Sequence, residues 1–248
     1  MFKKILLSTM LILTACSSVK DELLPITSTS EKAVEFYKTA FTHWEQGEGI
    51  EARNNFYSAL RVDPNFVLAN LYVNEPDPQQ RRKYRQTAVD NKNSASDAER
   101  IQVEMWEAQR DGESSKRLEL AKELAEKYNK SSLAHVWLGN VYTQQYMFDD
   151  AINSYKTALK INPDQYNAWR ELAKHHVVVG YNPMLPKERQ DKKLVVKYTE
   201  EMIRTRPKAP NAYQLRANIE RQYSNFEEAK PLYQKMVDVV NETGSSAK

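Results

Sequence analysis

Small and large residues recur between residues 138 and 163 at the offsets that two antiparallel helices need in order to pack together. The residues of this pattern are Leu138, Gly139 and Tyr142, followed after nine residues by Ala151, Tyr155 and Ala158, and closed by Pro163. Gly139 and Ala151 let the two backbones approach each other, and the tyrosines fill the space beside them. The stretch therefore predicts a helical hairpin.

The same spacing recurs on both sides of this stretch, as expected because one hairpin cannot bury its apolar face alone. The upstream copy consists of Ala52, Phe56, Ala59 and Pro64, with Gly47 at the turn, and the downstream copy of Ala229, Tyr233 and Met236. Ala52 lies 99 residues before Ala151, and Ala229 lies 78 residues after it. With a unit of about 34 residues, these intervals predict shortened repeats before the central one and a ten-residue insertion after it.

The stretch from Leu138 to Pro163 resembles the tetratricopeptide repeat, a helix-turn-helix with the pattern L-G-x2-Y…A-x3-F/Y-x2-A…P. It departs from the family at His135, where Trp is usual, and at Tyr146, where the turn Gly is usual, which predicts a less tight turn. The resemblance implies an all-α, TPR-type right-handed solenoid of about six helical hairpins, some of them degenerate.

The expected solenoid covers residues 31–243, and residues 244–248 form a tail. Its hairpins are expected at 31–64, 65–97, 98–131, 132–165, 166–209 and 210–243. Pro76 and Pro78 make the second hairpin the weakest. The fifth carries the insertion, near 181–190, which is either a functional loop on the binding face or a tolerated surface loop.

The N-terminus has the features of a signal peptide over residues 1–15, with Lys3 and Lys4 before an apolar run over residues 5–13. The sequence Leu13-Thr14-Ala15-Cys16 resembles the bacterial lipobox, and Cys16 is the one cysteine of the chain. Lipidation of Cys16 would anchor the protein in a membrane of the bacterial cell envelope, in the outer membrane facing the periplasm if the source is Gram-negative. An ordinary secretory signal with an incidental cysteine is the alternative.

Residues 16–30 are polar and contain Pro25, which predicts a tether between the lipid and the fold. The formal net charge of +3 falls to +1 without Lys3 and Lys4, which gives no support for nucleic-acid binding. Arg81, Arg82, Lys83 and Arg85 form the one dense basic cluster, expected either to touch anionic headgroups or to be a solvated face.

Residues with a pattern typical of catalysis are not found in the sequence, and neither an enzyme, a cofactor nor a small-molecule substrate is predicted. His175 and His176 are neighbours on an expected helix and point about 100° apart, so they do not share a metal ion in the usual helical manner. A nucleotide-binding phosphate loop and a G-x-S-x-G motif are also lacking.

In tetratricopeptide arrays the first helices of successive hairpins line a concave groove that binds peptides or helices of partner proteins. The resemblance places the following residues in such a groove: Tyr37, Phe41, Trp44, Trp106, Asn140, Thr143, Gln144, Arg170, Lys174, Gln214, Asn218 and Arg221. We expect the amides to pair with a peptide backbone, and Arg170 with Lys174 to hold a carboxylate, unless the neighbouring Glu171 neutralises them. The aromatic residues could instead pack against the tether.

These features predict a membrane-anchored scaffold that binds a protein or peptide, with a role in envelope or appendage assembly. Two alternatives remain from the sequence: a docking subunit of a cell-wall or polysaccharide enzyme complex, and a groove that stacks glycans on its aromatic rings. The identity of the partner is not encoded in any motif.

Overall fold

The computed structural model describes residues 20–176 and 187–244, and this part of the chain contains helices without strands. The α-helices of the first three hairpins are α1 (Glu31–Gln46), α2 (Gly49–Val62), α3 (Val67–Tyr72), α4 (Pro78–Asn91), α5 (Asp97–Arg110) and α6 (Ser114–Lys127). Those of the last three are α7 (Ser132–Gln144), α8 (Phe148–Ile161), α9 (Tyr166–Lys174), α10 (Lys192–Thr205), α11 (Pro210–Gln222) and α12 (Phe226–Thr243). Short 3₁₀ turns lie at Lys92–Ser94 (η1) and Lys187–Arg189 (η2).

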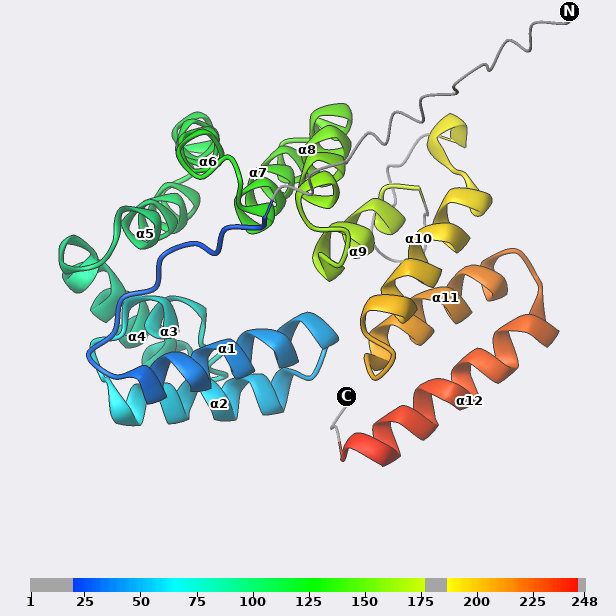
Figure 1. Ribbon diagram of the computed structural model, residues 1–248, viewed down its shortest axis with the longest axis horizontal. Helices are drawn as coiled ribbons and strands as arrows, with labels where there is room; N and C mark the ends of the chain where they lie inside the picture. The colour runs from blue at the N-terminus through cyan, green and yellow to red at the C-terminus, as the bar shows by residue number, and fades with distance from the viewer. Residues whose placement is uncertain (1–19, 177–186, 245–248) are drawn as a thin grey trace, which may run out of the picture.

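Consecutive helices pair into six antiparallel hairpins that follow one another around a closed curve (Figure 1). The first helix of each hairpin lies toward the inside of this curve, and α1 comes into contact with α11. The predicted fold class, an all-α solenoid of helical hairpins, is confirmed. Among the described residues, none of the helices combines the length and the apolar composition needed to cross a bilayer.

The fourth hairpin packs as its spacing predicts, because Gly139 of α7 faces the ring of Tyr155 on α8. A methyl group added at Gly139 would lie 2.5 Å from that ring. Ala151 and Ala158 are fully buried on the same side of α8. This close approach draws two helices into contact along their whole length, and only the smallest residues permit it.

The turn between α7 and α8 is as tight as the glycine turns, so the prediction of a looser turn is wrong. Tyr146 takes the left-handed conformation with φ of 60°. The N–H of Met147 then donates to the carbonyl of Tyr142 at 2.9 Å, as the N–H of Glu48 donates to His43 at 2.9 Å beside Gly47. Tyr146 therefore accepts a backbone strain of about 1 to 2 kcal/mol that glycine would avoid.

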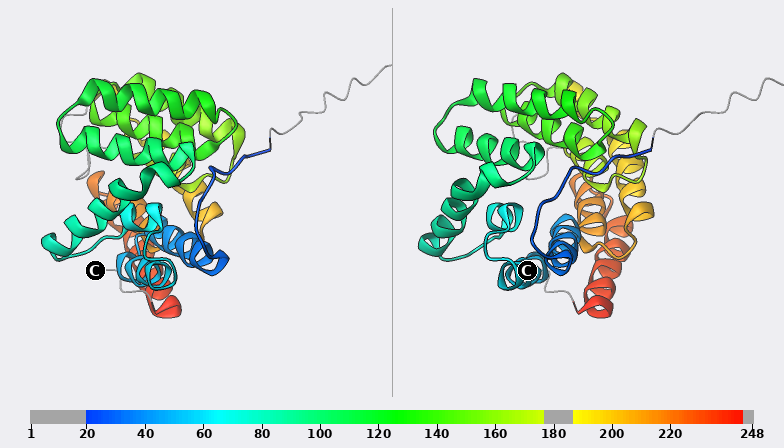
Figure 2. Two further views of the ribbon diagram at one scale, coloured as in Figure 1. Left: turned by 90° about the vertical axis from the view of Figure 1, so that its left-hand side faces the viewer. Right: turned by 60° about the vertical axis from the view of Figure 1, so that its left-hand side comes forward.

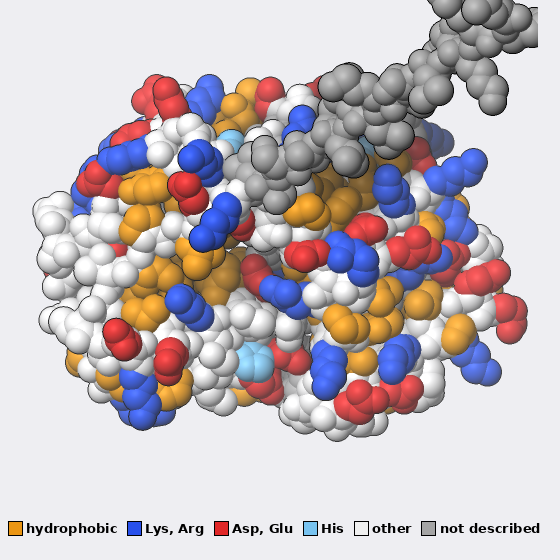
Figure 3. Space-filling model, in the orientation of Figure 1, with side chains coloured by type: hydrophobic (Ala, Val, Ile, Leu, Met, Phe, Trp, Pro, Cys, Tyr) orange, Lys and Arg blue, Asp and Glu red, His pale blue; other side chains and the backbone are white. Residues whose placement is uncertain are grey.

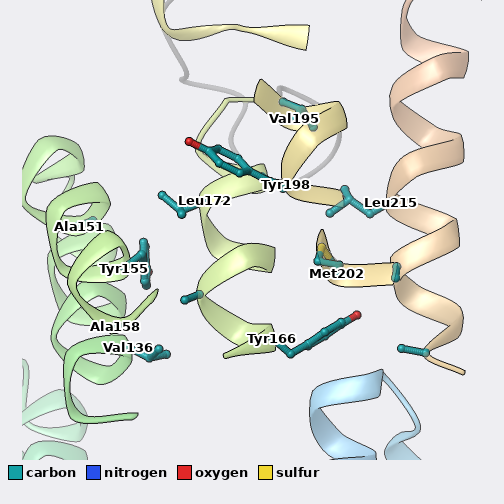
Figure 4. Close-up of a cluster of buried hydrophobic side chains, with 14 of the residues drawn as sticks. Val136, Ala151, Tyr155, Ala158, Tyr166, Leu172, Val195, Tyr198, Met202 and Leu215 are labelled. Carbon is teal, nitrogen blue, oxygen red and sulfur yellow. The ribbon is translucent and has the colours of Figure 1, made fainter. Parts of the chain in front are cut away.

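One of the two large clusters of the core lies where the last three hairpins meet (Figure 4). Its side chains come from five consecutive helices, and among them are Val136, Tyr155, Tyr166, Leu172, Val195, Met202 and Leu215. A second cluster joins the first two hairpins around Phe56 and Phe66, and a third joins α5, α6 and α7 around Ile101 and Leu124. Each hairpin thus buries its apolar face on its neighbours.

The second hairpin is the degenerate one, since α3 has only six residues. The guanidinium of Arg85 on α4 donates to the carbonyl oxygens of Asn70 and Val73 at the end of this short helix. A cation in this position satisfies carbonyl groups that have no partner within the helix and complements the helix dipole. Arg85 therefore points inward, and the expected basic cluster is divided between the interior and the surface.

Replacement of Gly139 by alanine should destabilise the protein, although alanine is the better helix former by about 1 kcal/mol. The added methyl group meets the Tyr155 ring, so we expect a net loss of about 1 to 3 kcal/mol in the free energy of urea unfolding. Gly49→Ala is the matched control, because no atom lies within 4 Å of a methyl group added there. Equal stability of the two variants would show that α7 and α8 do not pack as described.

Candidate partner-binding surface

The inner face of the curve carries the aromatic residues expected in a groove, but they contact one another. Phe41 lies 5.3 Å from Trp44 and 6.1 Å from Tyr72, measured between ring centroids. Tyr37 is buried and packs on Phe66 with centroids 5.2 Å apart. Tyr37 is therefore a core residue, whereas Trp44 retains 40% of its exposure.

The amides expected to hold a peptide backbone are used inside their own hairpins. The Tyr155 hydroxyl donates to Oδ1 of Asn140 at 2.9 Å, and the Tyr233 hydroxyl donates to Oδ1 of Asn218 at 2.6 Å. In both hairpins the Asn and the Tyr are separated by 15 residues. This repeated spacing, visible in the sequence, indicates a structural bond between the two helices.

Thr143 and Gln144 also have partners within the protein. Oγ1 of Thr143 lies 2.9 Å from Nε2 of His175, and Gln144 accepts a hydrogen bond from Arg117. Gln214 lines a separate hollow of about 300 Å³ between α1, α11 and α12, and Arg221 lines another beside Phe226. The structure therefore does not join the predicted polar residues into one groove.

The two residues of the predicted cationic pair share one carboxylate, that of their neighbour Glu171. Nε of Arg170 and Nζ of Lys174 donate to the same carboxylate oxygen of Glu171, at 3.0 and 2.9 Å. Burial alone would raise the pKa of Glu171, but the two cations outweigh it and hold that pKa below its usual value. Arg170 also lies over the ring of Trp44, 5.9 Å from its centroid. These contacts hold both cations inside the protein, and Glu171 offsets one of their two positive charges.

The two ends of the solenoid meet at Glu45, a residue that the sequence pattern did not reveal. Its buried carboxylate accepts a hydrogen bond from Asn167 at 2.7 Å and lies 3.6 Å from the guanidinium of Arg206. Its backbone carbonyl accepts from Arg170 at 3.2 Å and from Asn211 at 3.1 Å. The end of α1 is therefore fixed to α9, α10 and α11, and the inner face is enclosed.

Residues 20–30 differ from the polar linker expected there, because they lie against the solenoid (Figures 1 and 2). The carboxylate of Asp21 accepts from the backbone N–H of Ser132 at 2.8 Å, which caps α7 from a distant part of the chain. Further on, the N–H of Thr27 donates to the carboxylate of Glu99 at 3.0 Å. The N–H of Thr29 donates at 2.9 Å to the carboxylate of Asp63, which precedes α3. The segment therefore runs from the start of α7 past α5 to α3.

An apolar side chain fixes the middle of this segment. Leu24 is buried in the cluster of α5, α6 and α7, and a cavity of about 220 Å³ lies between the segment and residues of α1 and α3. Leu23 and Ile26 line that cavity together with Phe41. Hydrophobic side chains gather on the face that the segment crosses (Figure 3). The aromatic residues of the first hairpin are thus packed partly against the chain's own N-terminal segment.

A second cavity on the inner side is not lined by residues 20–30, and we call it the arginine pocket. It has a volume of about 210 Å³, and its walls are Leu71 and Tyr72 of α3, Arg85 of α4, Gln102, Met105, Trp106 and Gln109 of α5, Arg117 of α6, and Trp137 of α7. Of the predicted groove residues, only Trp106 lies here. Tyr72 was missed because no groove residue was predicted in the second hairpin, and Trp137 because the repeat register predicted Asn140, Thr143 and Gln144 for the fourth.

Aromatic rings form much of the wall of the arginine pocket. The rings of Tyr72 and Trp137 are stacked, with centroids 5.7 Å apart and planes 9° from parallel. The Tyr72 hydroxyl donates to Oε1 of Gln102 at 2.7 Å. Trp106 lines the same pocket one helical turn after Gln102, and the exposed guanidinium of Arg110 lies 5.2 Å from its ring centroid. The pocket thus combines flat apolar walls with a few polar groups, as ligand-binding cavities commonly do.

In the described parts of the chain, no group of three or more His, Cys, Asp or Glu side chains is placed to hold a metal ion.

The architecture and this pocket define a solenoid of helical hairpins, a class of protein that uses its enclosed surfaces for binding. Residues 139–177 match the family model described as TPR repeat. This match covers the second part of α7 together with α8 and α9, where the sequence pattern is most complete.

Solved structures with a related succession of helices include PilW, described as a widely conserved type IV pilus biogenesis factor. It is 16% identical, with 88% of this chain and 96% of that chain covered and a TM-score of 0.49. A MamA protein is 15% identical over 88% of this chain and 97% of that chain, with a TM-score of 0.45. A tetratricopeptide repeat protein from Parabacteroides merdae is 16% identical over 86% of this chain and 80% of that chain, with a TM-score of 0.45. No curated protein matches the sequence. Likenesses at this level say nothing about the function of the chain.

His175 should make the stability of the protein depend on pH. Burial lowers the pKa of His175 from 6.5 to about 4, and Nδ1 of its ring is buried without a hydrogen-bond partner. Between these two pH values the unfolded chain binds a proton that the folded chain does not bind. Stability should therefore fall as the pH falls from about 6.5 toward about 4, by an amount of order 3 kcal/mol.

The measurement is urea unfolding at pH 7 and at pH 4.5, where His175→Gln should lose less stability than the wild-type protein. His135→Gln is the control, because His135 is partly exposed and its Nε2 lies 3.0 Å from the carbonyl of Asn129. If the wild type and His175→Gln lose the same stability on acidification, His175 is not the responsible group.

Proposed function

We propose that the protein is a lipid-anchored scaffold of the bacterial envelope that binds a partner protein through the arginine pocket on its inner face. The observation that supports this most directly is the pocket itself. Three hairpins contribute its aromatic walls, and of the described N-terminal segment, residues 20–30, none lines it. Aromatic residues are enriched at sites where proteins bind one another, because they bury much area at a low cost in conformational entropy.

The proposed anchor is Cys16, which lies outside the described residues. The support for it is the lipobox resemblance together with the apolar run that precedes it. Lys20 is the first described residue, and four residues of fully extended chain span at most about 14 Å. A lipid on Cys16 would therefore hold the start of α7 close to the bilayer, because Asp21 is bonded to Ser132 there.

Replacement of Cys16 by serine should move the protein from the membrane fraction to the soluble fraction, since the thiol that carries the lipid is removed. Ser17→Ala is the control, because it keeps the cysteine and should remain with the membrane. The measurement is membrane fractionation with intact-mass analysis. A wild-type mass without added acyl groups would contradict the proposed anchor.

The proposed binding site can be tested with a photoreactive benzoyl-phenylalanine in place of Gln109, an exposed residue that lines the arginine pocket. Illumination of intact envelopes should give a crosslinked product that disappears when Trp106→Ala is added, because the partner loses an aromatic wall of its site. The same reagent in place of Glu126, which is exposed on the outer helix α6, should not give this product. Identical products from both positions would exclude the pocket as the specific contact.

A further inference from the structure

We infer that the arginine pocket is a carboxylate-binding site, which takes a planar or apolar group that carries one carboxylate. This inference rests on the proposed function, since it names the chemistry that the partner presents to the same pocket. The shared ligand chemistry has two sources: a carboxylate of a partner peptide, or a small free carboxylic acid.

The first argument is the balance of charge in the pocket. Arg85 and Arg117 line it from two different helices, and both lie close enough to Tyr72 to influence the ionisation of its hydroxyl. Among the described residues, no carboxylate forms an ion pair with either guanidinium. Their hydrogen bonds go to uncharged oxygens, those of Asn70, Val73 and Gln144. The pocket therefore holds two cations without a counter-charge.

The cost of this arrangement is visible in the ionisation of the two arginines. Burial lowers the pKa of Arg85 from 12.5 to about 10, with a smaller contribution from Arg81, and burial also lowers the pKa of Arg117. Neither guanidinium has an acidic group near enough to offset this loss of hydration. By contrast, the partly buried Arg100 is paired with Glu104 at 3.0 Å. A ligand carboxylate would supply the missing interaction.

The second argument is the set of hydrogen-bond donors that remain unused. Nε of Arg117 and Nε1 of Trp137 are both buried, and neither has a partner among the described residues. Buried N–H groups are normally satisfied, so two such groups on residues that line one cavity indicate a missing acceptor. Both groups donate and neither accepts, which matches a carboxylate, an acceptor with two oxygens.

The third argument is the shape and chemistry of the walls. The stacked rings of Tyr72 and Trp137, with Trp106 and Met105, present flat and apolar surface. A volume of about 210 Å³ is suited to a carboxylate with a short apolar or aromatic body. A guanidinium matches the planar carboxylate with two parallel hydrogen bonds, which gives the site its orientation. This residue set includes one of the positions expected in the groove, Trp106.

The test uses the purified full-length chain and follows quenching of tryptophan fluorescence, since Trp106 and Trp137 line the pocket. The probes are phenylacetate, a peptide that ends in a free phenylalanine carboxylate, and the same peptide amidated at its C-terminus. The free acid or the free peptide should quench the fluorescence saturably, and the amidated peptide should bind at least ten-fold more weakly. Tighter binding of the acid indicates a small-molecule ligand, and tighter binding of the peptide indicates a partner protein.

Arg117→Gln should weaken binding of the preferred probe ten-fold or more, and Trp137→Phe should weaken it several-fold because the ring remains and the N–H is lost. Arg110→Gln is the matched control, since Arg110 also lies beside Trp106 but is exposed and paired with Asp111 at 2.7 Å. Thermal unfolding of each variant shows whether the fold is retained. Trp137→Phe provides a second test if Arg117→Gln does not fold.

The inference is overturned if none of the carboxylates quenches the fluorescence, if phenyl phosphate or the amidated peptide binds as tightly, or if Arg117→Gln binds like the wild type. These failures are separate from failure of the proposed function. If crosslinking from position 109 persists in Arg117→Gln, the pocket binds a partner protein, and the inference that it recognises a carboxylate is contradicted. If the acid binds but no partner is crosslinked, the carboxylate-binding site is supported and the proposed scaffold function is contradicted.

Discussion

The buried carboxylate of Glu45 is the contact on which the enclosed shape of this solenoid depends. A charge placed among packed helices is unfavourable unless neighbouring groups satisfy it, and burial does raise the pKa of Glu45. Asn167 of α9 and Arg206, the residue that follows α10, provide the compensating hydrogen bond and charge. These partners exist only when the first hairpin lies against the fifth and sixth. The requirement to satisfy one carboxylate therefore fixes the curvature of the array and the distance between its ends.

The N-terminal segment adds a second long-range constraint across the first four hairpins. Asp21 caps α7, Leu24 enters the core beside α5, and Thr29 binds the carboxylate of Asp63 before α3. Polar side chains thus do two things in this protein: they end helices, and they fix hairpins that are not neighbours in the sequence. These contacts cover part of the surface of the solenoid. The arginine pocket belongs to the part that they leave open to a partner.

The fold was predictable from the sequence because the contacts inside one hairpin are local and repeat with a fixed spacing. Gly139 and Tyr155 illustrate this, since their offset predicts the close packing that the structure shows. The site was predictable only in part. Trp106 lies in the wall of the arginine pocket, but Arg170 and Lys174 are bound to Glu171. The contacts of Glu45 and Asp21 follow no period, because they depend on how far the array curves, and no local pattern encodes that curvature.

The contact between Glu45 and Asn211 joins residues that are 166 positions apart. An ordinary repeat array interacts only with its nearest neighbours, so its terminal repeats fray and can unfold while the middle remains intact. Here the terminal hairpins support each other, and opening one end removes support from the other. Closing a loop of this length lowers the conformational entropy of the chain, and no local contact offsets that loss. We therefore expect the two ends to dock late and slowly during folding. The protein should therefore unfold as one cooperative ring, with amide hydrogens near both ends protected to a similar degree.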